Sequence, residues 1–79
     1  MASERHPATQ HLLEQFGYEH LPPHLRAVSK PFRDLAINLL TLTDGPELSA
    51  GLRKLLEAKD CCVRQAVIDA RNAVTATGA

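Results

Sequence analysis

The sequence predicts an all-α protein in which a short N-terminal helix and arm precede a long antiparallel helical hairpin, assembled as a homo-oligomer. Apolar residues recur every three or four positions over two long stretches, which is the pattern of helices with one buried face. A turn signal at residues 43–46 separates the two stretches, and no segment alternates as a β-strand would. With 79 residues, the chain forms one domain at most.

The first fifteen residues are expected to be flexible apart from a short helix, and residues 1–8 are expected to be disordered. The residues at helical spacing are Leu12, Leu13 and Phe16. Gly17 then ends the run. The segment 16–23 is expected to be an arm and not a helix, because Gly17 frees the backbone and two prolines disfavour helical geometry before them.

The first long helix is predicted from Pro23 to about Thr43, with a proline in its first turn, where the missing N–H costs little. Pro31 removes an internal hydrogen bond, so this helix either kinks there or starts afresh near Ser29. We favour one kinked helix. Its apolar stripe consists of Leu25, Val28, Phe32, Leu35, Ala36, Leu39 and Leu40.

The second long helix is predicted from about Pro46 to Ala73, with Asp44 as a candidate N-cap and Gly45 as a conformationally permissive turn residue. Its stripe consists of Leu48, Leu52, Leu55, Leu56, Cys62, Val63, Ala66 and Val67. Two long amphipathic helices joined by a short turn must lie antiparallel, so residues 16–73 are expected to form a helical-hairpin domain. Residues 74–79 are expected to be a frayed tail.

Self-association follows from the extent of the apolar stripes. A chain this short buries only about 60% of its surface on folding, and one hairpin leaves part of each stripe uncovered. A two-fold interface between two hairpins is the simplest way to cover that surface. A deep catalytic cleft inside one subunit is not expected.

The charge balance and the apolar runs disfavour several classes of protein. Nine Lys plus Arg balance nine Asp plus Glu, whereas a protein that binds DNA or a membrane surface needs a basic excess. The longest apolar runs are far shorter than the ~20 residues of a membrane span. The N-terminus lacks the apolar core of a secretory signal, so a cytoplasmic location is expected.

Neither catalysis nor a bound metal or cofactor is expected. The four histidines form no zinc motif, and the sequence contains no nucleophile and base grouping, phosphate loop or dinucleotide fingerprint. The only cysteines, Cys61 and Cys62, are adjacent and cannot form an ordinary disulfide. We expect two free thiols, half-buried on the second long helix.

Lys59 continues the apolar row of the second helix at a position where a hydrophobic residue is expected. Such a lysine either extends outwards to solvent or meets an anion, and both interpretations stay open. Asp60 precedes Arg64 by one helical turn, in the order that favours an ion pair. The simplest interpretation of that pair is a solvated surface contact.

The arm carries the only tyrosine, Tyr18, in a chain almost without aromatic residues. An exposed ring on a mobile arm suits stacking on a base, worth about 1–3 kcal/mol per base; alternatively, Phe16 and Tyr18 simply hold the arm against the hairpin. Arg26, Lys30 and Arg33 share one face of the next helix, where they either bind phosphates or form a solvated face. Together these features fit a small anionic ligand with rings better than long nucleic acid.

Five segments of the chain also resemble a known family. Residues 16–22, 33–36, 44–47, 52–60 and 63–64 look like parts of the short phage-encoded cyclic-nucleotide sponges, which counter the CBASS defence and are related to the anti-Thoeris sponges. The likeness covers roughly residues 16–67. Helical hairpins of this spacing are common, whereas the aromatic arm joined to the Ala-Lys-Asp and Val-Arg stretches is more specific.

The resemblance implies a homo-oligomer, commonly a hexamer, that sequesters cyclic di- or trinucleotides without cleaving them in the cytoplasm of an infected bacterium. In relatives, an N-terminal aromatic residue and a basic residue early in the first long helix hold a cyclic dinucleotide between protomers. Tyr18 and Arg33 occupy the matching positions, with help expected from Lys30; where relatives carry a lysine, Arg33 is a departure that preserves the charge. By position, Lys59 and Arg64 are candidates for a second pocket that takes cyclic trinucleotides.

A different class of function stays open beside this one. The apolar stripes could serve only to join protein partners, which would make the chain a non-catalytic oligomerisation or adaptor module.

Overall fold

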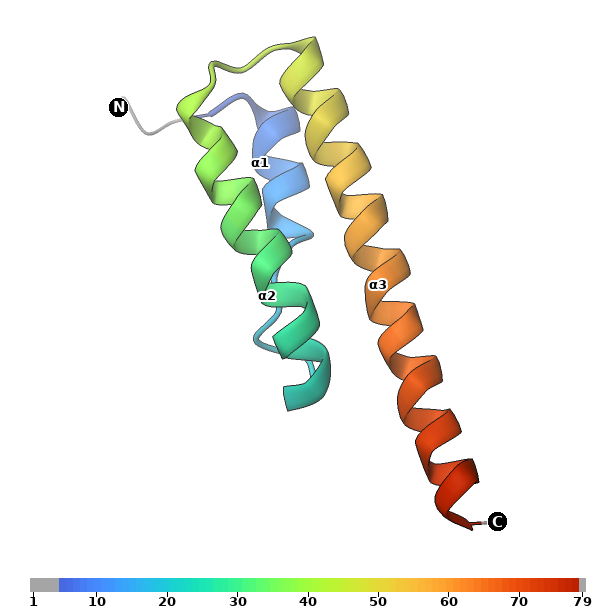
Figure 1. Ribbon diagram of the computed structural model, residues 1–79. Coiled ribbons are helices and arrows are strands. Elements are labelled where there is room, and N and C mark those ends of the chain that lie inside the picture. The colour runs from blue at the N-terminus through green and yellow to red at the C-terminus, as the bar shows by residue number, and fades with distance from the viewer. Residues whose placement is uncertain (1–4, 79) are drawn as a thin grey trace.

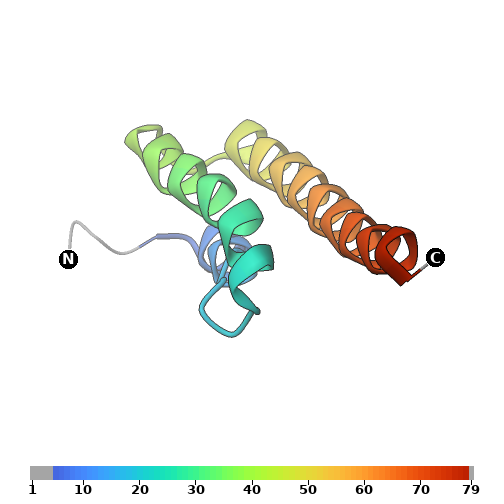
Figure 2. The same cartoon turned by 60° about the horizontal axis from the view of Figure 1, so that its bottom comes forward.

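The computed structural model describes residues 5–78, which form three α-helices and one short 3-10 helix. Helix α1 spans Pro7–Glu14, α2 spans Pro23–Asn38 and α3 spans Pro46–Gly78, with the 3-10 helix η1 at Leu39–Thr41. Helices α2 and α3 form an antiparallel hairpin, and α1 packs against one face of it (Figures 1 and 2). The predicted all-α hairpin preceded by a short helix is therefore confirmed for these residues.

Helix α1 begins with a local cap. The ring Nδ1 of His6 accepts the N–H of Ala8 at 3.0 Å, and Pro7 occupies a first-turn position that needs no N–H donor. Residues 7 and 8 are thus helical, so the expectation of disorder over residues 1–8 is wrong for them. Residues 1–4 lie outside the described part of the chain.

Asp44 ties the N-terminal segment to the connection between α2 and α3. Its Oδ2 accepts the backbone N–H of His6 at 2.7 Å, and its Oδ1 lies 3.1 Å from Nη1 of Arg5. The Arg5 guanidinium also donates to the carbonyls of Leu40 and Leu42. These bonds fix the position at which α1 starts relative to the hairpin.

The α2–α3 turn differs from the expectation in two respects. The carbonyl of Gly45 accepts the N–H of Ser49 at 3.0 Å, which makes Gly45 the residue that caps α3. The predicted capping role of Asp44 is therefore wrong, because its carboxylate faces the N-terminal segment. Neither Gly17 nor Gly45 has a positive φ, so the conformational freedom of glycine is not what these turns use.

Helix α2 continues through Pro31 without interruption, as the preferred interpretation of one helix required. The α-helix ends at Asn38, and η1 carries the chain to Thr41 before Leu42 becomes extended. The predicted end near Thr43 was therefore slightly late. The last turn tightens into a 3-10 helix, which is common at helix ends.

Helix α3 is 33 residues long against 16 for α2, and its C-terminal part projects beyond the start of α2 (Figure 1). It continues past the predicted end at Ala73, so residues 74–78 are helical where a frayed tail was expected, and residue 79 lies outside the described part. Cys61 and Cys62 are free, as expected, but they are exposed and not half-buried.

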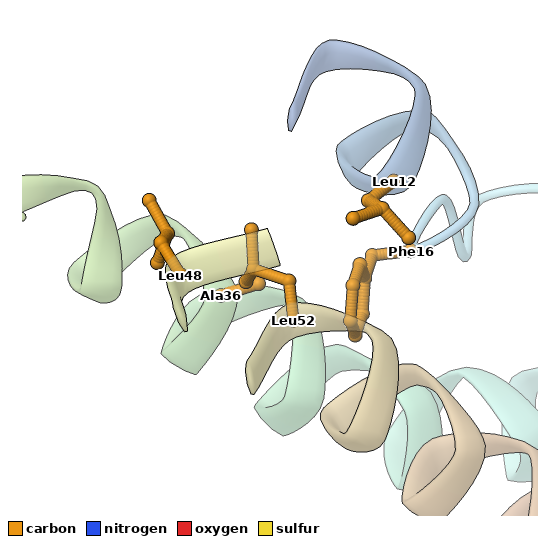
Figure 3. Close-up of a cluster of buried hydrophobic side chains, with 5 residues drawn as sticks. All are labelled: Leu12, Phe16, Ala36, Leu48 and Leu52. Carbon is orange, nitrogen blue, oxygen red and sulfur yellow. The ribbon is translucent and has the colours of Figure 1, made fainter. Parts of the chain in front are cut away.

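The hydrophobic core forms where all three helices meet. Its buried hydrophobic side chains are Leu12, Phe16, Ala36, Leu48 and Leu52 (Figure 3). The predicted stripes are buried only within this region, since Leu35, Cys62 and Val67 are exposed. A single copy therefore leaves the outer parts of both stripes uncovered.

Truncation of the core should be costly. Leu52 has 0% exposure and belongs to the cluster that joins α3 to α1 and α2. Leu52→Ala should lower the free energy of unfolding by about 2–5 kcal/mol, because it removes buried apolar surface and leaves a cavity. Val74→Ala, at a side chain with 72% exposure, should change it by about 0.5 kcal/mol or less. Urea unfolding measures both, and equal effects would contradict the assigned core.

The acid dependence of stability should depend on Asp44. The backbone N–H of His6, which donates to the Asp44 carboxylate, is the main reason that the pKa of this carboxyl lies below its usual value. The carboxylate therefore stabilises the fold above the unfolded-state pKa of about 3.9, and this contribution is lost as the pH falls through the lower folded-state pKa. Asp44→Asn cannot ionise, so between about pH 4.5 and 2.5 it should lose less free energy of unfolding than the parent chain.

Urea unfolding in steps across this pH range measures the difference between the two proteins. Parallel curves of unfolding free energy against pH would show that Asp44 does not have this role.

Candidate ligand-binding site

Two open hollows take part of their walls from the connection between α1 and α2. The Tyr18 hollow has a volume of about 370 Å³ and is lined by Tyr18, Glu19, Arg33, Asp34, Ile37 and Asn38. The Lys59 hollow has a volume of about 280 Å³ and is lined by Gln15, Gly17, His20, Leu21, Lys59, Asp60, Val63 and Arg64. The structure thus brings Tyr18 together with Arg33, and Lys59 together with Arg64.

The position of Tyr18 is set by the residues on either side of it. Phe16 is buried in the core, and the carbonyl of Tyr18 accepts the N–H of Leu21 at 3.0 Å, which closes a turn. The ring is half-buried and not exposed as the sequence suggested. A ring that already lies against the protein loses less conformational freedom when a ligand binds.

Arg33 is the cation of the Tyr18 hollow. It is half-buried on α2 and has no hydrogen-bond or ion-pair partner among residues 5–78. It also lines a neighbouring hollow of about 380 Å³ between α1 and α2, together with Gln10, Leu13, Glu14 and Ile37. Its guanidinium offers five N–H donors in a fixed geometry that suits a phosphate or a carboxylate.

Lys30 is already paired. Its Nζ lies 2.8 Å from Oδ2 of Asp34, one helical turn away, and both side chains are 55% exposed. The hydrogen bond that Lys30 donates to Asp34, followed by the charge of that carboxylate, raises the pKa of Lys30 above its usual value. Of the predicted cationic row Arg26, Lys30 and Arg33, only Arg33 lines the Tyr18 hollow.

Lys59 connects α3 to the end of α1. Its Nζ donates to the carbonyl of Gln15 at 3.1 Å and lies 3.1 Å from Oδ1 of Asp60. Gln15 is the C-cap of α1, where carbonyls lack partners within the helix and a positive charge is favoured. The side chain is only 12% exposed, so these contacts account for a lysine in an apolar row without an external anion.

Arg64 and Asp60 do not form the ion pair that their spacing favoured. Asp60 pairs with Lys59, and Nη2 of Arg64 donates to Sγ of Cys61 at 3.3 Å. A thiol is a weak acceptor, so the charge of Arg64 is only lightly engaged. Within the Lys59 hollow, Arg64 is thus the cation with more capacity to bind a ligand.

Five polar residues of these hollows were not among the residues predicted from the sequence, and they include Asp34 in the Tyr18 hollow and Gln15 in the Lys59 hollow. Glu19 and Asn38 line the Tyr18 hollow, and the exposed ring of His20 lines the Lys59 hollow. Asn38 lies four residues after Asp34, so helical periodicity was a signal that placed the two on one face. Glu19 and His20 lie in the arm, where no regular spacing indicates which way a side chain points.

No group of three His, Cys, Asp or Glu side chains within residues 5–78 is arranged to hold a metal ion. The same part of the chain contains no helix long and apolar enough to cross a membrane. No known protein family, curated protein or solved structure matches the chain.

Removing the amine of Lys59 should destabilise the fold. Lys59→Met keeps most of the apolar stem but leaves the Gln15 carbonyl and Asp60 without their donor. We expect the free energy of unfolding to fall by about 1–2 kcal/mol. The matched change Lys54→Met, at an exposed position on the same helix, should shift it by about 0.5 kcal/mol or less. Urea unfolding measures both, and equal stabilities would show that Lys59 does not secure α1.

Proposed function

We propose that this chain binds cyclic oligonucleotides and sequesters them without cleaving them. In this proposal it is a phage-encoded immune-evasion protein that inhibits CBASS-type signalling in the cytoplasm of an infected bacterium. The observation that carries the proposal is that Tyr18, which can stack on a base, and Arg33, an unpaired cation, line one hollow. Their sequence positions match the binding residues expected from the resemblance to cyclic-nucleotide sponges.

The size of the Tyr18 hollow supports a shared site. Its volume of about 370 Å³ is near the lower end of the 300–1,000 Å³ range typical of small-molecule sites. One chain therefore offers room for part of a cyclic dinucleotide. Ile37 lines the hollow while its side chain is 44% exposed, so a second copy that covers this side chain would also close the site.

Homo-oligomerisation, commonly as a hexamer among proteins of this kind, is part of the proposal. A sponge must compete with a host receptor, which requires nanomolar binding, about −12 kcal/mol. An open hollow on one chain excludes little water from its polar groups. A site closed by two copies buries the bases and places Arg33 side chains from two chains beside the two phosphates.

Of the two proposed sites, the Lys59 hollow has the weaker support. It brings Lys59 and Arg64 together, as a pocket for cyclic trinucleotides would require. Lys59 is already bound to Gln15 and Asp60, so Arg64 would have to provide most of the attraction for a phosphate.

An adaptor function is the second candidate, and a separate observation favours it. The C-terminal half of α3 carries three exposed hydrophobic side chains, Val67, Ile68 and Val74, with exposures of 39%, 42% and 72%. An uncovered apolar surface on a long helix is typical of a helix that packs against another protein.

Calorimetric titration with a panel of cyclic di- and trinucleotides tests the proposed function. At least one ligand should bind, and chromatography should recover it intact. Tyr18→Ala and Arg33→Gln should each weaken binding by about tenfold or more, since stacking on a base is worth about 1–3 kcal/mol. The control Arg26→Gln changes an exposed cation of the same helix that does not line the hollow, and it should bind normally.

Two results would contradict the proposed sequestering function. Binding of no panel member would leave the adaptor function, and recovery of a cleaved ligand would indicate an enzyme. Sedimentation during the titration measures whether a bound ligand is held by one copy or by several.

A further inference from the structure

The charged side chains of the Tyr18 hollow that have no partner carry charges of opposite sign. Asp34 is bound to Lys30 at 2.8 Å. Glu19 has no hydrogen-bond or ion-pair partner in the part of the chain that the structure describes, and its side chain is exposed. Beside the unpaired guanidinium of Arg33, the hollow thus presents one unpaired carboxylate.

An unpaired carboxylate is an unusual group in a site for an anionic ligand. It repels phosphates, so a site that served only to attract charge would be better without it. A carboxylate is useful there when it accepts hydrogen bonds from donors on an uncharged part of the ligand. In a nucleotide, that part is the base.

The bases differ in what they offer to a carboxylate. The Watson–Crick edge of guanine presents two adjacent donors, N1–H and N2–H, which match the two oxygens of an ionised carboxylate. The same edge of adenine presents one donor and an acceptor nitrogen, so one carboxylate oxygen would face another acceptor. A site built to receive hydrogen bonds discriminates strongly against a ligand that cannot make them.

We infer that Glu19 is a specificity-determining residue that selects guanine over adenine in cyclic dinucleotides. This inference rests on the proposed function, because it assigns the base that the same hollow receives. Glu19 directly follows Tyr18 in the arm and lines the same hollow, so a base stacked on the ring presents its edge next to the carboxylate. Arg33 then contacts the phosphate.

The remaining polar residue of the hollow does not supply this selectivity. Asn38 carries both a donor and an acceptor on its amide. Rotation of this amide therefore allows Asn38 to form hydrogen bonds with either guanine or adenine. Asp34 is held by Lys30, which leaves Glu19 as the acceptor that discriminates.

Titration calorimetry with cyclic di-GMP and cyclic di-AMP tests the inference. Both ligands have the same charge and the same sugar–phosphate ring, so the ratio of their dissociation constants isolates the contribution of the bases. The parent chain should bind cyclic di-GMP about tenfold tighter or more. Glu19→Gln can donate as well as accept, and it should reduce this ratio to about threefold or less.

The matched control is Glu14→Gln. Glu14 lines the neighbouring hollow that shares Arg33, and this change removes the same charge from the surroundings of that cation. Both ligands should bind slightly tighter to it, while the ratio stays as in the parent chain. Circular dichroism of each variant verifies the helical fold.

The outcomes separate the two proposals. Binding of both ligands with equal affinity, a preference for adenine, or an unchanged ratio in Glu19→Gln would overturn the inference and leave the proposed function in place. If the folded parent chain binds neither ligand, the proposed function fails for cyclic dinucleotides, and the inference fails with it.

Discussion

The arrangement of both hollows depends on the burial of Phe16. Its ring has 0% exposure at the end of α1, within the core shared by all three helices. Because the chain leaves α1 at this point, the buried ring fixes where the connection to α2 begins. The bond from Lys59 to the carbonyl of Gln15 holds the same point from the side of α3. Tyr18 and His20 follow within four residues, so their positions are determined by packing that lies outside either hollow.

Local periodicity predicted the long helices well, because the apolar stripe of a helix consists of residues only three or four positions apart in the sequence. The errors lie where distant residues meet. The sequence predicts Asp44 as a helix cap because Asp is favoured just before a helix, yet the partners of its carboxylate are Arg5 and His6 near the N-terminus. The end of α3 was placed too early, since nothing in the residues after Ala73 except small side chains marks a stop.

The candidate site was predicted in part. The sequence indicated Tyr18 and Arg33, and the fold brings them to one hollow across the turn between arm and helix. The sequence also identified Lys59 as anomalous in its apolar row. Its partner, the backbone carbonyl of Gln15, could not be predicted, because every residue has a backbone carbonyl and none is marked by its side chain. Glu19 carried no signal of its own, because an acidic residue in an arm is ordinarily a solvated one.

The two hollows share one short piece of backbone. Tyr18 and His20 are separated by a single residue in the arm, and each belongs to a different hollow. A molecule that displaced the arm on one side would therefore alter the opposite wall as well. Thermodynamic linkage requires such an effect to be reciprocal, so occupancy of either hollow would change the affinity of the other by the same factor. The eight-residue connection between α1 and α2, residues 15–22, would then couple the two sites of a two-ligand protein.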